Sequence, residues 1–255
     1  MDAPPLGGGG LIAELGSHQL DACSIFLGKV HPLAVTGVGG KFFYKDEREV
    51  EDHVFCTFEF PGSKHFKKDK EGKLALDKNG HPVIDDKDDV VVVTYSSVST
   101  NDFEKYGECV MGNKATMVVE MEQNIQLYAG KAGRATEVGI GSAAGATPVL
   151  ESAGSTPGAA RPAAVASGAA GGVSKGYREE MNHFAYCVRM WNQGSSKSDR
   201  PALRCHGRVA MADAIIALTS NLAMQTHQRI EFKDSWFDAG SNRTPEQDVR
   251  DKKDA

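Results

Sequence analysis

Six short segments rich in β-branched and aromatic residues follow one another between residues 32 and 129, and no helical pattern interrupts them. Gly, Asn, Asp and Lys separate the segments, and in the second one Val54, Cys56, Phe58 and Phe60 occupy alternate positions. Such alternation is typical of an antiparallel strand with one buried face. Because the strands form a block and do not alternate with helices, we predict an α+β fold with a mostly antiparallel open β-sheet and helices packed on one face. The six segments are residues 32–40, 53–60, 89–99, 106–112, 115–122 and 124–129.

Helical periodicity flanks this block on both sides. Apolar residues recur at helical spacing over 11–27, with Gly28 as a stop signal, and again over 177–194 and 207–227. A short strand is expected at 229–232, followed by a polar tail that we expect to fray. Residues 61–89 are expected to form a long exposed loop or hairpin.

The composition changes abruptly between residues 131 and 175, where Ala, Gly, Ser and Pro dominate. A segment with so little apolar surface cannot offset its ordering entropy, and we expect a flexible insertion. The domain boundaries predicted from these patterns are 1–128 for the opening helix and sheet, 129–176 for the insertion, 177–240 for the closing helices and last strand of the same domain, and 241–255 for the polar tail.

Charge and hydropathy exclude several classes of partner. The net charge is −5 and no basic stripe is interleaved with aromatic residues, so we expect no nucleic-acid binding. No apolar run reaches the roughly 18 residues of a membrane span, and the N-terminus does not resemble a signal peptide. We therefore expect a soluble, cytoplasmic protein without membrane contacts. The five cysteines are widely scattered among apolar neighbours, and we expect them to be reduced and buried.

Two glycine-rich stretches suggest a dinucleotide-binding loop, but neither has the required context. Residues 37–42 break the G-x-G-x-x-G pattern at Phe42. Residues 139–144 satisfy its looser form, yet the segment before them does not resemble a buried strand and the segment after them does not resemble a helix. Phosphate binding needs both elements, so we expect no cofactor loop at either place.

The opening segment GGGGLIAELGSHQLDACSIFLG, residues 7–28, carries the candidate chemistry. On a helix Glu14 and His18 would be neighbours on one face, with Asp21 on the same side. A histidine flanked by carboxylates can exchange protons with a substrate near neutral pH. An ordinary exposed helical pair explains the same residues, and a metal site would need a third ligand that the sequence does not indicate.

This segment resembles the start of the C-terminal, substrate-binding domain of the Gfo/Idh/MocA oxidoreductase family. In that family a Gly-rich turn is followed by an acid, a histidine four residues on, an aspartate and a Leu-Gly stop. The resemblance continues through residues 32–40, through 50–62 with an acid at Asp52, through 106–128, and through the closing helices and last strand. It implies a fold like that of the dihydrodipicolinate reductase C-terminal domain.

In this family NAD or NADP sits on an N-terminal Rossmann domain whose Glu-Lys-Pro lysine takes part in proton transfer. The resemblance implies that His18 is the acid–base group toward a sugar or polyol hydroxyl. Glu14, where relatives often have aspartate, and Asp21 would then support it. This sequence contains neither the Rossmann half nor Glu-Lys-Pro, so we expect the chain alone to be inactive and to bind no cofactor.

Three hypotheses follow for the function. The first is a C-terminal substrate-binding and oligomerisation domain, separated from its cofactor domain. The second is a stand-alone, non-catalytic module that oligomerises or binds carbohydrate, and the third is an unrelated α+β protein with metal-assisted chemistry. The resemblance implies a homo-oligomer formed through the sheet face and a separate Rossmann domain as partner. Further candidates for substrate binding are Asn182, His183 and Arg204, although a solvated helix face explains the first two equally well.

Overall fold

The computed structural model describes residues 8–78, 80–101, 106–121, 124–129, 135–142, 148–152, 177–193 and 200–253. The chain forms two compact units, one made of Met1–Asn101 and Cys205–Ala255, the other of Asp102–Arg204. The predicted α+β class with antiparallel sheets is confirmed. The second unit begins at Asp102 and so includes the predicted insertion; the domain boundaries expected from the sequence stay a prediction.

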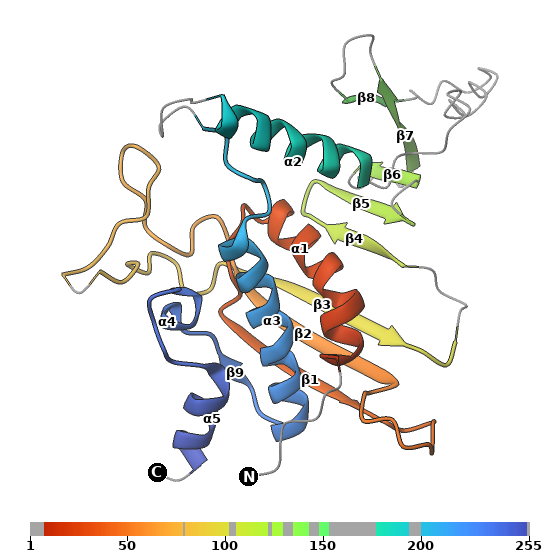
Figure 1. The fold of residues 1–255 in the computed structure, drawn as a ribbon, viewed down its shortest axis with the longest axis vertical. Coiled ribbons are helices and arrows are strands. Elements are labelled where there is room, and N and C mark those ends of the chain that lie inside the picture. The colour runs from red at the N-terminus through yellow and green to blue at the C-terminus, as the bar shows by residue number, and fades with distance from the viewer. Residues whose placement is uncertain are drawn as a thin grey trace. The chain divides into compact units, whose positions relative to one another are not determined.

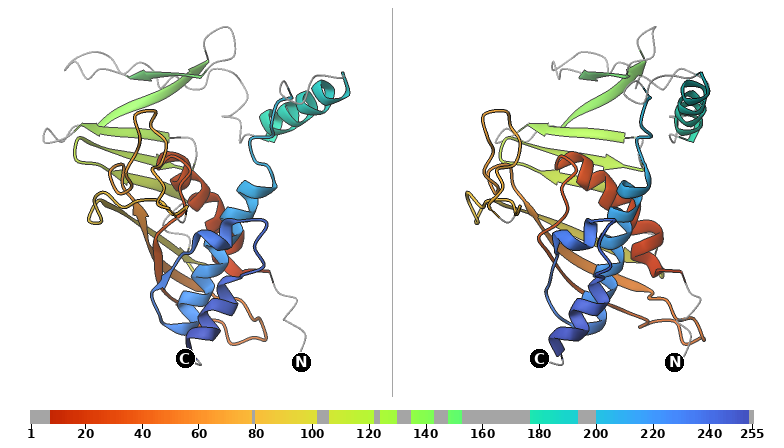
Figure 2. Two further views of the ribbon diagram at one scale, coloured as in Figure 1. Left: turned by 90° about the vertical axis from the view of Figure 1, so that its left-hand side faces the viewer. Right: turned by 60° about the vertical axis from the view of Figure 1, so that its left-hand side comes forward.

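The first unit is a four-stranded antiparallel sheet with helices on one face (Figure 1). Its strand order is β3-β2-β1-β9, so the last short strand pairs with the first strand of the chain. Helices α1 and α3 lie side by side over the same face of the sheet (Figure 2). The elements are η1 (Ile12–Gly16), α1 (Ser17–Phe26), β1 (Ala34–Gly40), β2 (His53–Pro61), β3 (Val90–Val98), α3 (Gly207–Thr226), β9 (Ile230–Glu231), α4 (Asp234–Phe237) and α5 (Pro245–Lys253).

The core of this unit lies between the sheet and α3. Alternate residues of β2 are buried there, as the sequence pattern predicts: Val54, Cys56, Phe58 and Phe60. Two glycines of β1 allow α3 to approach the sheet closely. A Cβ at Gly37 would lie 2.9 Å from Met224 Cγ, and one at Gly39 would collide with Met224 Sδ. Gly37 and Gly39 therefore serve helix packing, and the absence of a cofactor loop here stays a prediction.

The second unit contains a five-stranded antiparallel sheet in which consecutive strands pair, together with one helix. Its elements are β4 (Gly107–Met111), β5 (Ala115–Glu120), β6 (Asn124–Ala129), β7 (Ala135–Ser142), β8 (Pro148–Ser152) and α2 (Tyr177–Asn192). Strands β7 and β8 lie within the predicted flexible insertion, and its flexibility stays a prediction. The backbone of Gly139–Ser142 is part of β7, while residues 153–176 of the insertion lie outside the described residues.

Every strand and helix that the sequence predicts is present within a few residues of its expected bounds. The long excursion after β2 folds back on itself through isolated bridges, such as Phe66 with Ile84 and Leu76 with Pro82. No helix in the described part of the chain is both long and apolar enough to cross a lipid bilayer.

The polar tail is not frayed as we expected. Residues Pro245–Lys253 form α5, and Val249 joins the core of the first unit. Asp248 is 6% exposed and accepts hydrogen bonds from Lys233 Nζ at 2.7 Å and from Trp236 Nε1 at 2.9 Å. A buried carboxylate with several donors therefore fixes a segment whose composition alone suggested disorder.

The expectation of five buried cysteines is only partly correct. All five are free thiols: Cys56 and Cys187 are buried and Cys23 is half-buried, but Cys109 and Cys205 are exposed. Cys109 lies on β4 of the second unit, where alternate residues of the strand face opposite sides of the sheet.

Candidate functional site

The opening helix begins with a π-helical turn and not with a regular α-helix. Residues Ile12–Gly16 form this turn and α1 continues from Ser17. Gly10, with a φ of 77°, lets the chain enter the turn, because a side chain is unfavourable in this conformation. Gly16 lies against β3, where a Cβ would be 3.0 Å from Tyr95 Cζ. π-helical turns are rare in proteins, and those that occur are often found at functional sites. This segment therefore remains the leading candidate for the functional site.

Glu14 and His18 are both exposed, and no hydrogen bond joins them. Glu14 belongs to the π-turn and His18 to the first turn of α1. The Glu14 carboxylate instead lies against the backbone of Gly8, where a Cβ would collide with Glu14 Oε1. The support of His18 by Glu14 therefore stays a prediction.

His18 has neither a hydrogen bond nor an ion pair among the described residues. Its side chain stands on the exposed face of α1, two residues after Gly16. An imidazole in this state has both ring nitrogens available to a ligand.

Asp21, the third predicted residue of the helix, forms an ion pair with Lys29. Lys29 follows Gly28 and has a φ of 62°, which is uncommon for a residue with a side chain. Asp213 on α3 is close enough for this pair to affect it: burial raises the pKa of Asp213, the charge of Asp21 raises it further, and Lys29 opposes the change. Lys29 and Asp213 were not identified from the sequence. The signal that could have identified Asp213 is that it is an acidic residue within the apolar stretch of α3.

The other predicted site residues belong to the second unit. Asn182 is exposed on α2, and Arg204 is exposed in the segment before α3. His183 is half-buried, and its Nε2 lies 3.7 Å from Cys187 Sγ, one helical turn further on. Their assignment as substrate-binding residues stays a prediction.

A second acid–histidine pair, which the sequence analysis missed as a pair, lies at the start of β2. Asp52 is completely buried, and its carboxylate accepts hydrogen bonds from the backbone N–H groups of Phe42, Phe43 and Tyr44, each at 2.9 Å. His53 Nδ1 lies 2.6 Å from Asp52 Oδ1. Burial raises the pKa of Asp52, but the hydrogen bonds from His53 and from these amides outweigh burial and hold the pKa well below its usual range.

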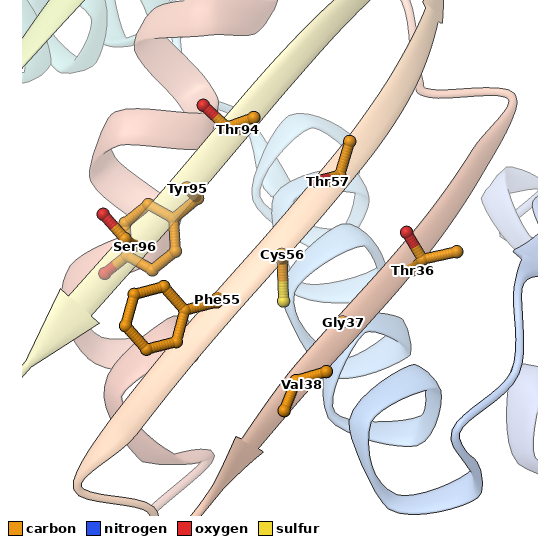
Figure 3. Close-up of a pocket in the computed structure, with 9 residues that line it drawn as sticks. All are labelled: Thr36, Gly37, Val38, Phe55, Cys56, Thr57, Thr94, Tyr95 and Ser96. Atoms are coloured by element: carbon orange, nitrogen blue, oxygen red, sulfur yellow. The ribbon is translucent and has the colours of Figure 1, made fainter.

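The sheet face opposite the helices carries a shallow hollow of about 410 Å³ (Figure 3). Thr36, Thr57 and Thr94 stand in register across β1, β2 and β3 and form one row of hydroxyl groups. Phe55 lies in the next row, and the residues around the hollow are Thr36, Gly37, Val38, Phe55, Cys56, Thr57, Thr94, Tyr95 and Ser96. Among the described residues no group of three or more His, Cys, Asp or Glu side chains could hold a metal ion. We refer to this face of the four-stranded sheet as the outer face.

Residues 2–67 match the family model described as the GFO/IDH/MocA C-terminal domain. The match covers about a quarter of the chain. The match includes the π-turn, His18 and the strand pair β1 and β2, so the resemblance drawn from the sequence is confirmed there. No curated protein matches the chain significantly.

Solved structures of similar fold carry the description oxidoreductase. A candidate NADPH-dependent oxidoreductase from Desulfitobacterium hafniense DCB-2 aligns over 88% of this chain and 48% of its own, with 14% identity and a TM-score of 0.50. A candidate oxidoreductase from Bacteroides fragilis NCTC 9343 aligns over 89% and 54%, with 12% identity and a TM-score of 0.45. An Agrobacterium radiobacter oxidoreductase, solved with NAD+, L-tartaric acid and magnesium, aligns over 88% and 50%, with 15% identity and a TM-score of 0.42.

At such identities the likeness concerns the fold alone, and the Desulfitobacterium structure supports the α+β fold described above. The chain spans about half the length of the solved structures that it resembles.

Proposed function

We propose that this chain is the C-terminal substrate-binding and oligomerisation domain of an NAD(P)-dependent oxidoreductase that acts on a sugar, a polyol or a related hydroxyl compound. The observation that carries this proposal is the exposed, unpartnered His18 on a helix that lies inside the family match. A Rossmann domain outside this sequence, on the same or another chain, would complete the enzyme.

His18 is suited to proton transfer with a substrate hydroxyl. A neutral imidazole can accept the hydroxyl proton, and the imidazolium can return it, near neutral pH. Glu14 and Asp21 would support the charged form from a distance, because Glu14 faces Gly8 and Asp21 is paired with Lys29. Asn182, His183 and Arg204 are proposed to contact the substrate.

The two glycine-rich stretches lack the context of a dinucleotide-binding loop. Met224 packs against Gly37 and Gly39 of β1, and Gly139 and Gly141 lie inside strand β7. Neither stretch therefore precedes a helix whose N-terminus could receive a pyrophosphate. We therefore assign no cofactor step to this chain and expect neither NAD nor NADP to bind it alone. Saturable quenching of Trp191 or Trp236 fluorescence by micromolar cofactor would contradict this expectation.

We propose the outer face as the surface through which copies of the chain associate. Val38, Phe55 and Val92 are 58%, 48% and 62% exposed on it, and a sheet face of this kind is commonly covered in an assembly. The measurement that tests association is sedimentation of the purified chain over a range of concentrations.

Substrate binding can be tested on the chain itself. A panel of sugars and polyols is added to the purified protein, and its thermal midpoint is measured, since a ligand that binds only the folded state raises it. We expect a subset of polyols to raise the midpoint for the native sequence and not for His18→Ala. The matched control is His81→Ala, an exposed histidine in the loop after β2, which should respond as the native sequence does. An unchanged polyol response in His18→Ala would remove His18 from the site.

The role in turnover needs the cofactor domain. When the chain is joined to a family Rossmann domain that restores activity, His18→Ala should lower kcat by about 100-fold or more and leave KM within a few-fold, as expected for loss of an acid–base group. A kcat close to that of the native sequence would refute the assignment.

A second candidate function is a stand-alone, non-catalytic module, which the exposed outer face favours independently of His18. The coding sequence upstream of Met1 distinguishes the two functions. An in-frame G-x-G-x-x-G with Glu-Lys-Pro supports the oxidoreductase domain, whereas an intergenic region with its own ribosome-binding site supports the module.

A further inference from the structure

The Asp52–His53 pair fixes the tautomer of His53. All positions around the Asp52 carboxylate are taken by donors, because Oδ1 accepts from Phe42 N and Oδ2 accepts from Phe43 N and Tyr44 N. The depressed pKa of Asp52 keeps this carboxylate ionised, so the proton in the 2.6 Å contact belongs to His53 Nδ1. The neutral ring must then carry its lone pair on Nε2.

His53 projects toward the outer face of the sheet. Along β2 the burial pattern alternates, and His53 shares its side with Phe55, Thr57 and Glu59, whereas Val54 and Cys56 face the core. The His53 side chain is 24% exposed, and its Nε2 has no hydrogen-bond partner among the described residues. The exposed ring of Phe42 lies beside it, with the two ring centroids 5.8 Å apart.

We propose that His53 is a proton-binding site within the self-association surface of this chain, and that protonation of its Nε2 opposes the pairing of two copies. This inference rests on the proposed association through the outer face and names how that association is regulated.

The physical reason is the different environment of Nε2 in the two states. In a free copy Nδ1 of His53 is bonded to Asp52, and the partly exposed Nε2 side of the ring meets water. When a second copy covers the outer face, Nε2 loses that water, and this desolvation favours the neutral ring. Dissociation is then accompanied by proton uptake, of up to about one proton per chain, so lowering the pH weakens the pair.

The elements packed against His53 bring few competing charges. Its cross-strand neighbours are Gly40 on β1 and Val98 on β3, which carry none. The charged residues of the loop between β1 and β2 either have other partners or are exposed. Lys41 and Lys45 donate hydrogen bonds to carbonyl groups of the loop, and Asp46 pairs with Arg48. Glu51 lies against Gly10, and Glu47 and Glu49 face solvent. Asp52 therefore remains the charged group bonded to the ring.

The test measures the dissociation constant of the self-associated chain by sedimentation at several pH values between about 5.5 and 8, where histidine titrates. We expect the constant to rise at least about ten-fold on acidification, with a slope of up to about two protons per pair. In His53→Asn the side-chain amide can still donate to Asp52 but does not titrate, so the constant should become nearly independent of pH. His31→Asn is the matched control, because His31 pairs with Asp234 outside the outer face and its loss should leave the pH dependence intact.

The possible results separate the inference from the proposed function. Association of the native chain that is equally strong at both ends of the pH range overturns the inference and leaves the interface standing. Retention of the pH dependence in a folded His53→Asn, checked by circular dichroism, also overturns it. If that variant does not fold, the slope of the native chain decides alone: a slope near zero overturns the inference. A native chain that stays monomeric at every pH refutes the proposed interface itself, and the inference with it.

Discussion

Asn221 on α3 donates a hydrogen bond from its Nδ2 to the carbonyl oxygen of Gly9, at 2.7 Å. This hydrogen bond holds the glycine run that precedes the π-turn against α3, although Gly9 and Asn221 are 212 residues apart in sequence. The run looks in sequence like a free loop or a hinge. In the structure Gly9 is packed, since a Cβ there would lie 2.5 Å from Ala13 Cβ and 3.1 Å from Leu218 Cδ2. The junction before His18 is therefore a fixed support for the helix.

The first prediction concerns this packing. Gly9→Ala should lower the free energy of unfolding by about 1–3 kcal/mol, because the new methyl group would overlap Ala13 and press on Leu218. Urea denaturation measures the change. Gly207→Ala is the control, since a Cβ there meets no atom within 4 Å, and its stability should stay the same or rise by up to about 1 kcal/mol. Equal stabilities of the two variants would show that Gly9 is not packed.

The second prediction concerns the anchor of the C-terminal helix. Asp248→Asn should destabilise the protein by about 1–3 kcal/mol near neutral pH, because Lys233 and Arg243 would lose their buried anionic partner. Hydrogen bonding to Lys233 outweighs burial and, with Trp236 and Arg243, lowers the pKa of Asp248 to about 2. The contribution of the ionised Asp248 carboxylate to the free energy of unfolding is present above the ordinary pKa of an aspartate. It is lost as the pH falls toward about 2.

The difference in unfolding free energy between the native sequence and Asp248→Asn should therefore shrink when denaturation is repeated from pH 5 down to pH 2. Asp88→Asn, in the exposed loop before β3, should change stability by less than about 0.5 kcal/mol at every pH. If the difference in unfolding free energy stays constant on acidification, the ionised carboxylate of Asp248 is not its cause.

The third prediction concerns the edge of the outer face. Arg229 forms a two-pronged ion pair with Glu59 of β2, at 2.7 and 2.8 Å, and a further bond to Glu231 of β9 at 2.8 Å. These side chains are 35–66% exposed, so a double-mutant cycle with Arg229→Lys and Glu59→Gln should give a coupling of only about 0.5–1 kcal/mol. Molar salt should reduce it further. A coupling above about 2 kcal/mol would mean that this network is shielded from solvent.

The fourth prediction concerns thiol reactivity. Burial, helped by the charge of Glu51, raises the pKa of Cys56 to about 12, so this thiol should not react with iodoacetamide at pH 8 while the protein is folded. Cys109 and Cys205 are exposed and should react first. Mass spectrometry of partially labelled protein gives the order, and urea should bring Cys56 to the rate of the others. Early labelling of Cys56 in folded protein would contradict its place in the core.

Periodicity was sufficient to predict the strands and helices of this protein because burial of alternate residues in β2, or of one face of a helix, leaves a local pattern. It failed where stability comes from distant partners. The tail from Pro245 is polar, yet it folds as α5 because Asp248 meets Lys233 and Trp236. The strands β7 and β8 were missed because backbone pairing, with few apolar side chains in the sequence, defines them.

The sequence by itself determined the α+β class, the resemblance of the opening segment to a family model, and the candidate role of His18. These depend on residue order and spacing, which the chain carries locally. Only the tertiary structure decided that Glu14 lies against Gly8, that Gly9 is held by Asn221, and that Asp52 fixes the ring of His53. The first two depend on where a side chain meets a backbone group further along the chain, and the third on the backbone amides of Phe42, Phe43 and Tyr44 that hold the Asp52 carboxylate. Hydrogen bonds between such segments are set by packing in three dimensions, which spacing along the chain does not encode.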